Sequence, residues 1–161
     1  MLPSSNHDSP WLKRMSRPDS TTRMNDAAAR LRAVGLRPTK QRIALADLLF
    51  GGGDRHFTAE QLHADALAAR KRVSLATVYN TLHQFVGAGL LREISVAQGR
   101  SWFDTNTGTH HHFYHVDHGE LRDIPGGGVT VASLPSAPEG TQIERIDVVV
   151  RIRNAPRPAA D

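Results

Sequence analysis

Residues 73–91, VSLATVYNTLHQFVGAGLL, decide the fold that this sequence predicts. Ser74 is a residue type that caps helix N-termini well. The residues after it keep a helical apolar period as far as the glycine-rich end of the stretch. The apolar positions of that period are Leu75, Val78, Leu82 and Phe85. The pattern therefore predicts a helix over residues 74–89 with one buried face.

Directly after this helix the apolar period changes to two. LLREISV (90–96) and RSWFDT (100–105) alternate as strands do, and Ala97, Gln98 and Gly99 lie between them where a hairpin turns. A helix that leads into a two-stranded hairpin is typical of a winged-helix domain, in which the last helix enters the DNA major groove.

Three further helices are predicted before this one. They cover residues 24–35, ending at Gly35, then 40–50 after the cap Thr39, then 58–71 beginning with the capping box Thr58–Gln61. Helices of this length with such short connections indicate a small bundle.

After the hairpin the chain has strand-like segments at 111–116, 120–124 and 144–153, and a Gly- and Pro-rich segment for which no element is predicted. Three strands cannot bury a core alone, so we expect a homodimer in which a second copy completes the core. The predicted class is α+β, with an N-terminal winged-helix DNA-binding domain followed by a small α/β dimerisation domain. The expected divisions are a flexible arm at 1–22, the winged helix at 23–105, the dimerisation and sensing domain at 106–153 and a tail at 154–161.

The composition excludes several classes of protein. Hydrophobic residues make up 39% of the 161 residues and charged residues 22%, as in a globular protein. No apolar run approaches the ~20 residues of a membrane span. The N-terminus lacks the apolar segment of a secretory signal, and the chain contains no cysteine. Disulfides, thiolate catalysis and Cys-based zinc sites are excluded, and the cytoplasm is the expected compartment.

Basic charge is concentrated in the first half of the chain. Residues 26–92 hold ten basic and five acidic side chains, whereas residues 93–153 hold five basic and eight acidic ones. The basic half suits contact with a polyanion, because neutralised phosphates dominate affinity for DNA. The candidates for phosphate contact are Arg37, Lys40 and Arg42, with Arg70, Lys71 and Arg72.

Polar side chains on the helix predicted at 74–89 suit contact with DNA. Ser74, Thr77, Asn80 and Thr81 fall opposite the apolar stripe, with Tyr79 beside them. These groups reach phosphates and base edges. An ordinary solvated helix face is the alternative, and the bundle, the hairpin and the local charge together favour a DNA-binding surface.

Five histidines lie within the nine positions 110–118. On a strand, side chains two residues apart share a face, so His110 and His112 can hold one ion while His111 points away. Neutral imidazole suits Zn, Fe, Mn, Ni or haem iron, and Asp123 or His56 can complete the ligand set.

His115 and His118 are a second pair, which can share an ion only if the chain turns between them. Three other interpretations apply to the whole cluster: a purification tag, a chance surface cluster, and histidines that only make structural hydrogen bonds. The cluster is internal and continues into structured sequence, which argues against a tag.

Four segments in order resemble the ferric uptake regulator superfamily. They are GLRPTKQRIALADLL (35–49), HFTAEQLHADA (56–66), VSLATVYNTLHQFVGAGLL (73–91) and THHHF (109–113). The resemblance covers about residues 24–153. Within the superfamily, DTNTGTHHHFYHVD (104–117), LRDIP (121–125) and RIDVVVRIR (145–153) look most like the haem-sensing iron response regulator, Irr.

This resemblance implies a dimeric winged-helix transcription factor of iron and haem homeostasis that is active at low iron and inactivated by haem. Arg37 and Tyr79 match DNA-contacting residues of the superfamily, and His56, His110, His112 and Asp123 match ligands of its regulatory metal site. A haem-synthesis enzyme is the candidate haem donor.

The sequence departs from the family pattern at three places. The acidic fifth ligand expected in the wing is replaced by Ala97, so that site is expected to be incomplete or differently closed. His115 and His118 stand where the family has a Cys-x-x-Cys zinc pair, so only a histidine substitute for that site is possible. The Cys-Pro haem motif of some Irr proteins is also absent, so haem sensing has to use His110, His111 and His112.

Two other functions compete with haem sensing. A metal-co-repressed member of the same superfamily would use Fe(II), Mn(II) or Zn(II) at His56, His110, His112 and Asp123. A His-ligated metalloenzyme would use an open coordination position. The chain has no HExxH helix and no nucleophile elbow, so we expect that it is not an enzyme.

Overall fold

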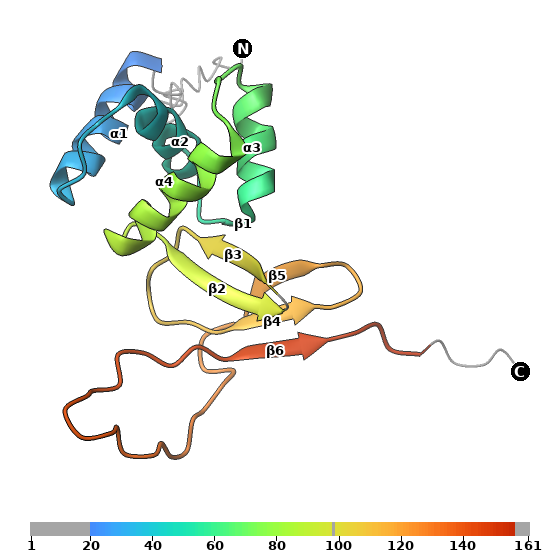
Figure 1. Cartoon of the computed structure of the whole chain (residues 1–161). Helices are drawn as coiled ribbons and strands as arrows, with labels where there is room; N and C mark the ends of the chain where they lie inside the picture. The colour runs from blue at the N-terminus through green and yellow to red at the C-terminus, as the bar shows by residue number, and fades with distance from the viewer. Residues whose placement is uncertain (1–19, 98, 157–161) are drawn as a thin grey trace, which may run out of the picture.

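The computed structural model describes residues 20–97 and 99–156, so most of the predicted N-terminal arm and part of the predicted tail lie outside the described residues. Four helices come first: α1 (Ser20–Ala33), α2 (Lys40–Phe50), α3 (Ala59–Ala68) and α4 (Leu75–Gly87). They pack together on one side of two small sheets (Figure 1). Because α1 begins at Ser20, residues 20–22 belong to this helix and not to the arm.

The helix starts are set by local capping. Thr39, Thr58 and Ser74 each accept a hydrogen bond from the backbone N–H three residues further on, as the sequence predicts. Helix α3 ends earlier than predicted because Arg70 takes a left-handed φ of 57° and the Lys71 N–H turns back to the Ala66 carbonyl at 2.8 Å.

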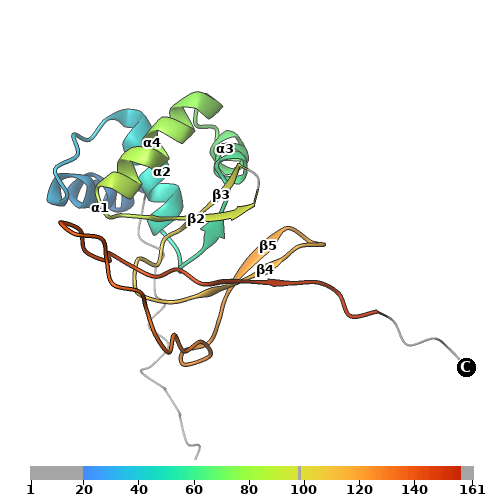
Figure 2. The ribbon, with the colours of Figure 1, turned by 60° about the horizontal axis from the view of Figure 1, so that its bottom comes forward.

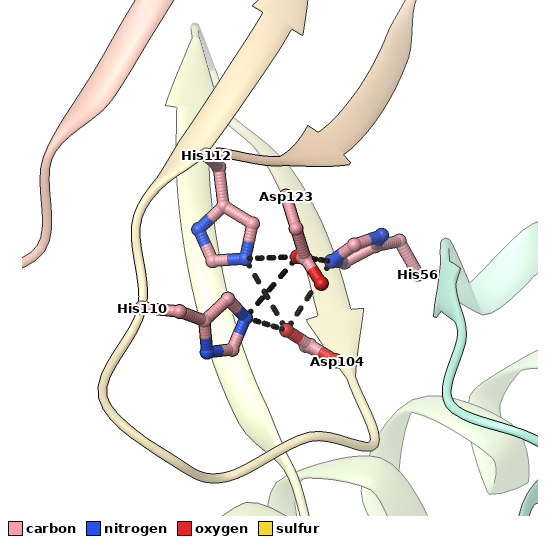
Figure 3. A group of neighbouring side chains, drawn as sticks. All are labelled: His56, Asp104, His110, His112 and Asp123. Atoms are coloured by element: carbon pink, nitrogen blue, oxygen red, sulfur yellow. Dashed lines mark hydrogen bonds and ion pairs between the residues drawn. The ribbon is translucent and has the colours of Figure 1, made fainter. Parts of the chain in front are cut away.

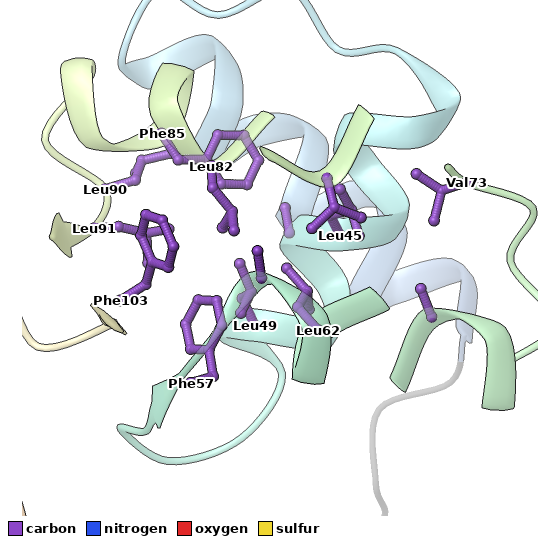
Figure 4. Close-up of a cluster of buried hydrophobic side chains, with 14 of the residues drawn as sticks. Leu45, Leu49, Phe57, Leu62, Val73, Leu82, Phe85, Leu90, Leu91 and Phe103 are labelled. Atoms are coloured by element: carbon purple, nitrogen blue, oxygen red, sulfur yellow. The ribbon is translucent and has the colours of Figure 1, made fainter. Parts of the chain in front are cut away.

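One apolar core joins the helices to the strands that follow them (Figure 4). Its fully buried large side chains are Leu31, Leu45, Leu49, Phe57, Leu62, Leu82, Phe85 and Phe103. The rings of Phe57 and Phe103 stack with centroids 5.8 Å apart. These two aromatic residues therefore anchor the first sheet to the helices.

The first sheet is the predicted hairpin with one added strand. Strands β2 (Arg92–Ala97) and β3 (Arg100–Asp104) pair antiparallel, and β1 (His56–Phe57) pairs antiparallel with β3 on its other side. We call this β1-β3-β2 sheet the wing. Strand β1 is too short to show a period of two, and the sequence did not predict it. Its register sets His56 directly opposite Asp104.

The second sheet has the strand order β5-β4-β6. Strand β4 (His112–His115) pairs antiparallel with β5 (Glu120–Asp123) and parallel with β6 (Val149–Ile152). All three strands are shorter than predicted. The register sets His112 directly opposite Asp123.

The wing lies between the helices and the second sheet in both views (Figures 1 and 2). Ile94, Val96 and Trp102 of the wing pack with Tyr114 and Leu121 of the second sheet in a small separate core. The wing of the same chain thus supplies part of the core that was expected from the sequence to need a second copy. No helix in the part of the chain that the structure describes is long and apolar enough to cross a membrane.

Replacing Thr58 by Ala should lower the free energy of unfolding by about 0.5–2 kcal/mol. The substitution removes the hydrogen bond from the Gln61 N–H and one half of the capping box of α3. Urea denaturation followed by circular dichroism measures the change. Thr130→Ala, at an exposed loop position, is the matched control and should stay within about 0.5 kcal/mol of the wild type. Equal stabilities for the two variants would contradict the role given to the cap.

Candidate functional site

Five side chains from separate parts of the chain converge at the junction of the two sheets (Figure 3). They are His56, Asp104, His110, His112 and Asp123, and one ligand atom from each lies within 4.8 Å of all the others. Among the described residues this is the only such group of three or more His, Asp or Glu side chains.

Strand pairing explains the convergence. His56 and Asp104 are register partners in the wing, and His112 and Asp123 are register partners in the second sheet. His110 lies two residues before His112 on the segment that enters β4, and its Nε2 points toward the same place (Figure 3). The wing therefore contributes two of the side chains. The second sheet, together with the segment that leads into β4, contributes the other three.

The distances between the ligand atoms suit a shared transition-metal ion. The Oδ2 of Asp104 lies 2.7 Å from Nε2 of His110 and 3.2 Å from Nε2 of both His56 and His112. The Oδ1 of Asp123 lies 2.9, 3.2 and 3.5 Å from the Nε2 atoms of His56, His110 and His112. Ligand bonds of about 2.1 Å at angles between 90° and 109° separate neighbouring ligands by about 3.0–3.4 Å.

The direction of the His56 ring gives a second test of the fit. Its Nε2 is buried and lies 3.2 Å from Oδ2 of Asp104 and 2.9 Å from Oδ1 of Asp123, so it is directed at both carboxylates. A ring nitrogen that is directed at two carboxylate oxygens at once is placed to share one ion with them. Three neutral imidazoles and two carboxylates also balance the charge of a divalent cation, so the residues present fit such an ion.

The carboxylates and imidazoles of this cluster shift one another's protonation. Burial alone would raise the pKa of Asp104, but hydrogen bonds from His112, His56 and the Asn106 N–H hold that pKa far below its usual range. Burial would lower the pKa of His56, whereas Asp104 and Asp123 raise it overall. The cluster therefore favours a charged carboxylate on Asp104 and a proton on His56.

The structure brings together the four metal ligands proposed from the sequence, and it adds Asp104. The wing therefore does carry an acidic side chain at the site, at Asp104 and not at Ala97, so the cluster is closed differently from the family pattern. Asp104 is 1% exposed and lies opposite His56, a relation that depends on the unpredicted strand β1. The signal available in the sequence was an aspartate that ends an apolar strand six residues before His110.

The histidine triplet does not act as one group. His110 and His112 join the cluster, whereas Nδ1 of His111 accepts a hydrogen bond from the Val148 N–H at 3.3 Å. His115 and His118 lie on a turn closed by a bond from the Gly119 N–H to the His115 carbonyl, and their ring centroids are 4.2 Å apart. No third His, Asp or Glu of the described residues completes a ligand group with this pair.

The predicted DNA-facing side chains divide into two groups on α4. Asn80 is exposed, and Ser74 and Thr77 lie at the N-terminus of the helix, where Ser74 is the cap. Thr81 is 4% exposed and belongs to the buried face with Val78, so its predicted position opposite the apolar stripe is wrong. The physical reason is the helical period, since residue 81 is three positions after Val78 and one turn before Phe85.

Side chains outside α4 hold the polar face in place. The Arg42 guanidinium donates to Oε1 of Gln84 at 2.8 and 3.0 Å and to the Arg37 carbonyl at 2.7 Å, so it ties α2 to α4. The Tyr79 hydroxyl donates to Oε1 of Glu60 at 2.6 Å. Arg37 and Lys40 are exposed.

A helical bundle with a wing, joined to a His- and Asp-lined cation site, defines a metal-responsive transcription regulator. Residues 33–150 match the ferric uptake regulator family. The chain belongs to this family.

Individual relatives agree with this assignment. The chain is 36% identical over 92 residues to the ferric uptake regulation protein of Pseudomonas aeruginosa, which spans 56% of this chain and 69% of that protein. It is 33% identical over 97 residues to that of Cupriavidus metallidurans, and 31% identical over 101 residues to the peroxide-responsive repressor PerR of Staphylococcus aureus. These matches span 60% and 63% of this chain and 68% of each relative.

Solved structures resemble the whole arrangement. The ferric uptake regulator of Pseudomonas aeruginosa with manganese matches with a TM-score of 0.60 at 26% identity, over 80% of this chain and 97% of that one. The ferric uptake regulator of Vibrio cholerae matches with a TM-score of 0.62 at 22% identity, over 79% and 98%, and this shows the fold alone.

Proposed function

We propose that this protein regulates genes of iron homeostasis, and that a divalent transition metal held by His56, Asp104, His110, His112 and Asp123 controls its affinity for DNA. The observation that carries the proposal is that these ligand atoms converge from two different sheets. The site therefore lies where an ion can fix the wing relative to the second sheet.

The chain's own residues explain how occupancy is coupled to DNA binding. Without a cation, the two carboxylates have only the three imidazoles beside them as partners within the cluster. A bound divalent ion supplies positive charge and a fixed ligand geometry. Wing strand β2 follows α4 after a short connection, so a fixed wing restrains the orientation of that helix. By linkage, a metal that strengthens DNA binding is itself bound more tightly in the DNA complex.

Mn(II), Fe(II) and Zn(II) all suit a site of three imidazoles and two carboxylates. The similarity to the Pseudomonas aeruginosa regulator solved with manganese supports Mn(II) as the first metal to test. His115 and His118 are a candidate second site, which needs a further ligand from outside the described residues or from water.

The proposed DNA contacts follow from the face of α4. Asn80, Thr77 and Tyr79 face or border that surface, with Ser74 at its start. Arg37, Lys40 and Arg42 supply positive charge beside it. We propose a homodimer acting in the cytoplasm, so that each copy places one α4 in one half-site. Exposed apolar side chains of the second half, Val131, Leu134, Ile143 and Val150, support an association through that half.

The Irr-like alternative is release of DNA by haem bound at His110, His111 and His112, with haem delivered by a haem-synthesis enzyme. The resemblance of residues 104–117 supports it. The separate hydrogen bond of His111 and the shared direction of His110 and His112 favour the five-residue metal site.

One titration separates the two possibilities. Metal-stripped protein is mixed with a labelled duplex of iron-box type at fixed salt, and the complex is followed by fluorescence anisotropy. We expect Mn(II) to tighten DNA binding by about 5–150-fold, the usual range of allosteric coupling, and haem to leave it unchanged. Tight binding by metal-free protein, reversed by haem, would instead establish the haem-responsive mechanism.

A further inference from the structure

Arg92 occupies an unusual position for a charged side chain. It is the first residue of β2, and its side chain is only 2% exposed. Its NH1 donates to the Gly108 carbonyl at 2.5 Å and lies 3.1 Å from Nδ1 of His110, while its NH2 pairs with Asp147. A buried guanidinium is costly unless it is paired, so this residue calls for a specific role.

We propose that Arg92 is a positioning residue of the metal site, which fixes the ring of His110 through the Gly108 carbonyl and ties that ligand to the C-terminal segment at Asp147. The proposal rests on the metal-regulated function above. Arg92 is not itself one of the five proposed metal ligands. It joins three parts of the chain: the wing, the ligand-bearing loop and the segment before β6.

Two contacts around the Gly108 carbonyl orient the ring of His110. Arginine can only donate, so its contact with Nδ1 of His110 is not a hydrogen bond to a protonated nitrogen. The Gly108 carbonyl lies 2.8 Å from that same Nδ1. If the carbonyl accepts from both, Nδ1 donates to it, and Nε2, which lies 2.7 Å from Oδ2 of Asp104, is the nitrogen left to bind a cation. Metal-binding histidines are commonly oriented by a hydrogen bond of this kind on the other ring nitrogen.

The loop between two ligands is held by a continuous set of hydrogen bonds. Oδ1 of Asp104 accepts from the Asn106 N–H at 2.8 Å, and the Asn106 side chain accepts from the Gly108 N–H at 3.0 Å. Arg92 then holds the carbonyl of the same Gly108. The bonded path from one ligand, Asp104, to another, His110, therefore runs through Gly108, whose carbonyl Arg92 holds.

Asp147 extends this path to the second sheet. Burial would raise its pKa, but Arg145 and Arg92 lower it overall, so the carboxylate stays charged. The next residue, Val148, donates its N–H to His111 and accepts from the N–H of His112 at 3.0 Å. The Arg92–Asp147 pair thus links the first strand after α4 to the segment that flanks the metal ligands.

The test compares Arg92→Met with Arg92→Lys and with Arg145→Met. Arg145 pairs with the same Asp147 but is 41% exposed, which makes it the matched control. Affinity for Mn(II) is measured by chelator competition, and long-range proton–nitrogen spectra of the metal-free protein report the His110 tautomer. We expect Arg92→Met to weaken Mn(II) binding by about 10–100-fold and to alter the His110 signal, since outer-shell changes have effects of this size. Arg92→Lys should recover part of the affinity by donating to Gly108, and Arg145→Met should match the wild type.

Asp147→Asn provides a second variant, with nearly unchanged volume, if Arg92→Met does not fold. It should weaken Mn(II) binding less than Arg92→Met and more than Arg145→Met. Wild-type affinity and an unchanged His110 tautomer in a folded Arg92→Met or Asp147→Asn protein would overturn the positioning role. If wild-type protein binds no metal, the proposed function fails, and the His110 tautomer in the metal-free variants still decides the role of Arg92.

Discussion

Asp104→Asn should lower the affinity for Mn(II) by more than about 100-fold, beyond the range usual for outer-shell changes around a metal. Asp104 is the one carboxylate of the site that is 1% exposed, and its Oδ2 lies within 3.2 Å of all three imidazole nitrogens. An amide of the same shape leaves one carboxylate to balance a divalent cation, and it places a neutral oxygen or an NH2 group toward the ion. DNA binding should then no longer respond to Mn(II).

The design of this variant separates loss of the ion from loss of the fold. An asparagine oxygen can still accept the Asn106 N–H, the bond that Oδ1 of Asp104 makes at 2.8 Å. The circular dichroism spectrum of the metal-free protein should therefore remain close to the wild type, although its melting temperature should fall because three imidazoles lose their carboxylate partner. Glu120→Gln, on the same β5 strand as Asp123 but exposed and paired with Arg122, is the matched control. Retention of wild-type Mn(II) affinity in Asp104→Asn would remove this residue from the site.

The helical half of the fold could be predicted because its signals are local. The caps Thr39, Thr58 and Ser74 act within one helical turn, and the wing hairpin is closed by a turn of a few residues. Such signals can be recognised in a short window of sequence. The ends of the elements were less accurate, as for α3, where the left-handed Arg70 stops the helix.

The site could be predicted only in part because its geometry depends on distant pairings. His110 and His112 are neighbours in sequence, but Asp104 joins them through pairing of β3 with a two-residue strand that has no periodic signal. Arg92 and Asp147 are 55 positions apart, and no local pattern marks the pair. Thr81 was misplaced for a different reason: its polar type suggested an exposed position, whereas the helical period places it on the buried stripe.

Adjacent residues of α4 give the sharpest test of the DNA-binding surface. Asn80 is exposed, and Thr81, the next residue, is 4% exposed. Asn80→Asp keeps the size of the side chain but places a negative charge on the face proposed to meet DNA. Because a like charge at such a surface costs several kcal/mol, we expect DNA affinity to fall by more than about 100-fold.

Thr81→Val is the control for the same helix turn, since it alters a buried side chain and leaves the exposed face unchanged. Its DNA affinity should equal that of the wild type, although its stability can shift because a buried hydroxyl is lost. Anisotropy with Mn(II)-loaded protein measures both variants, and chelator competition verifies that each still binds the metal. If Asn80→Asp bound DNA as tightly as Thr81→Val, this face of α4 would not be the DNA-contacting surface, and another basic face of the first half would have to take that role.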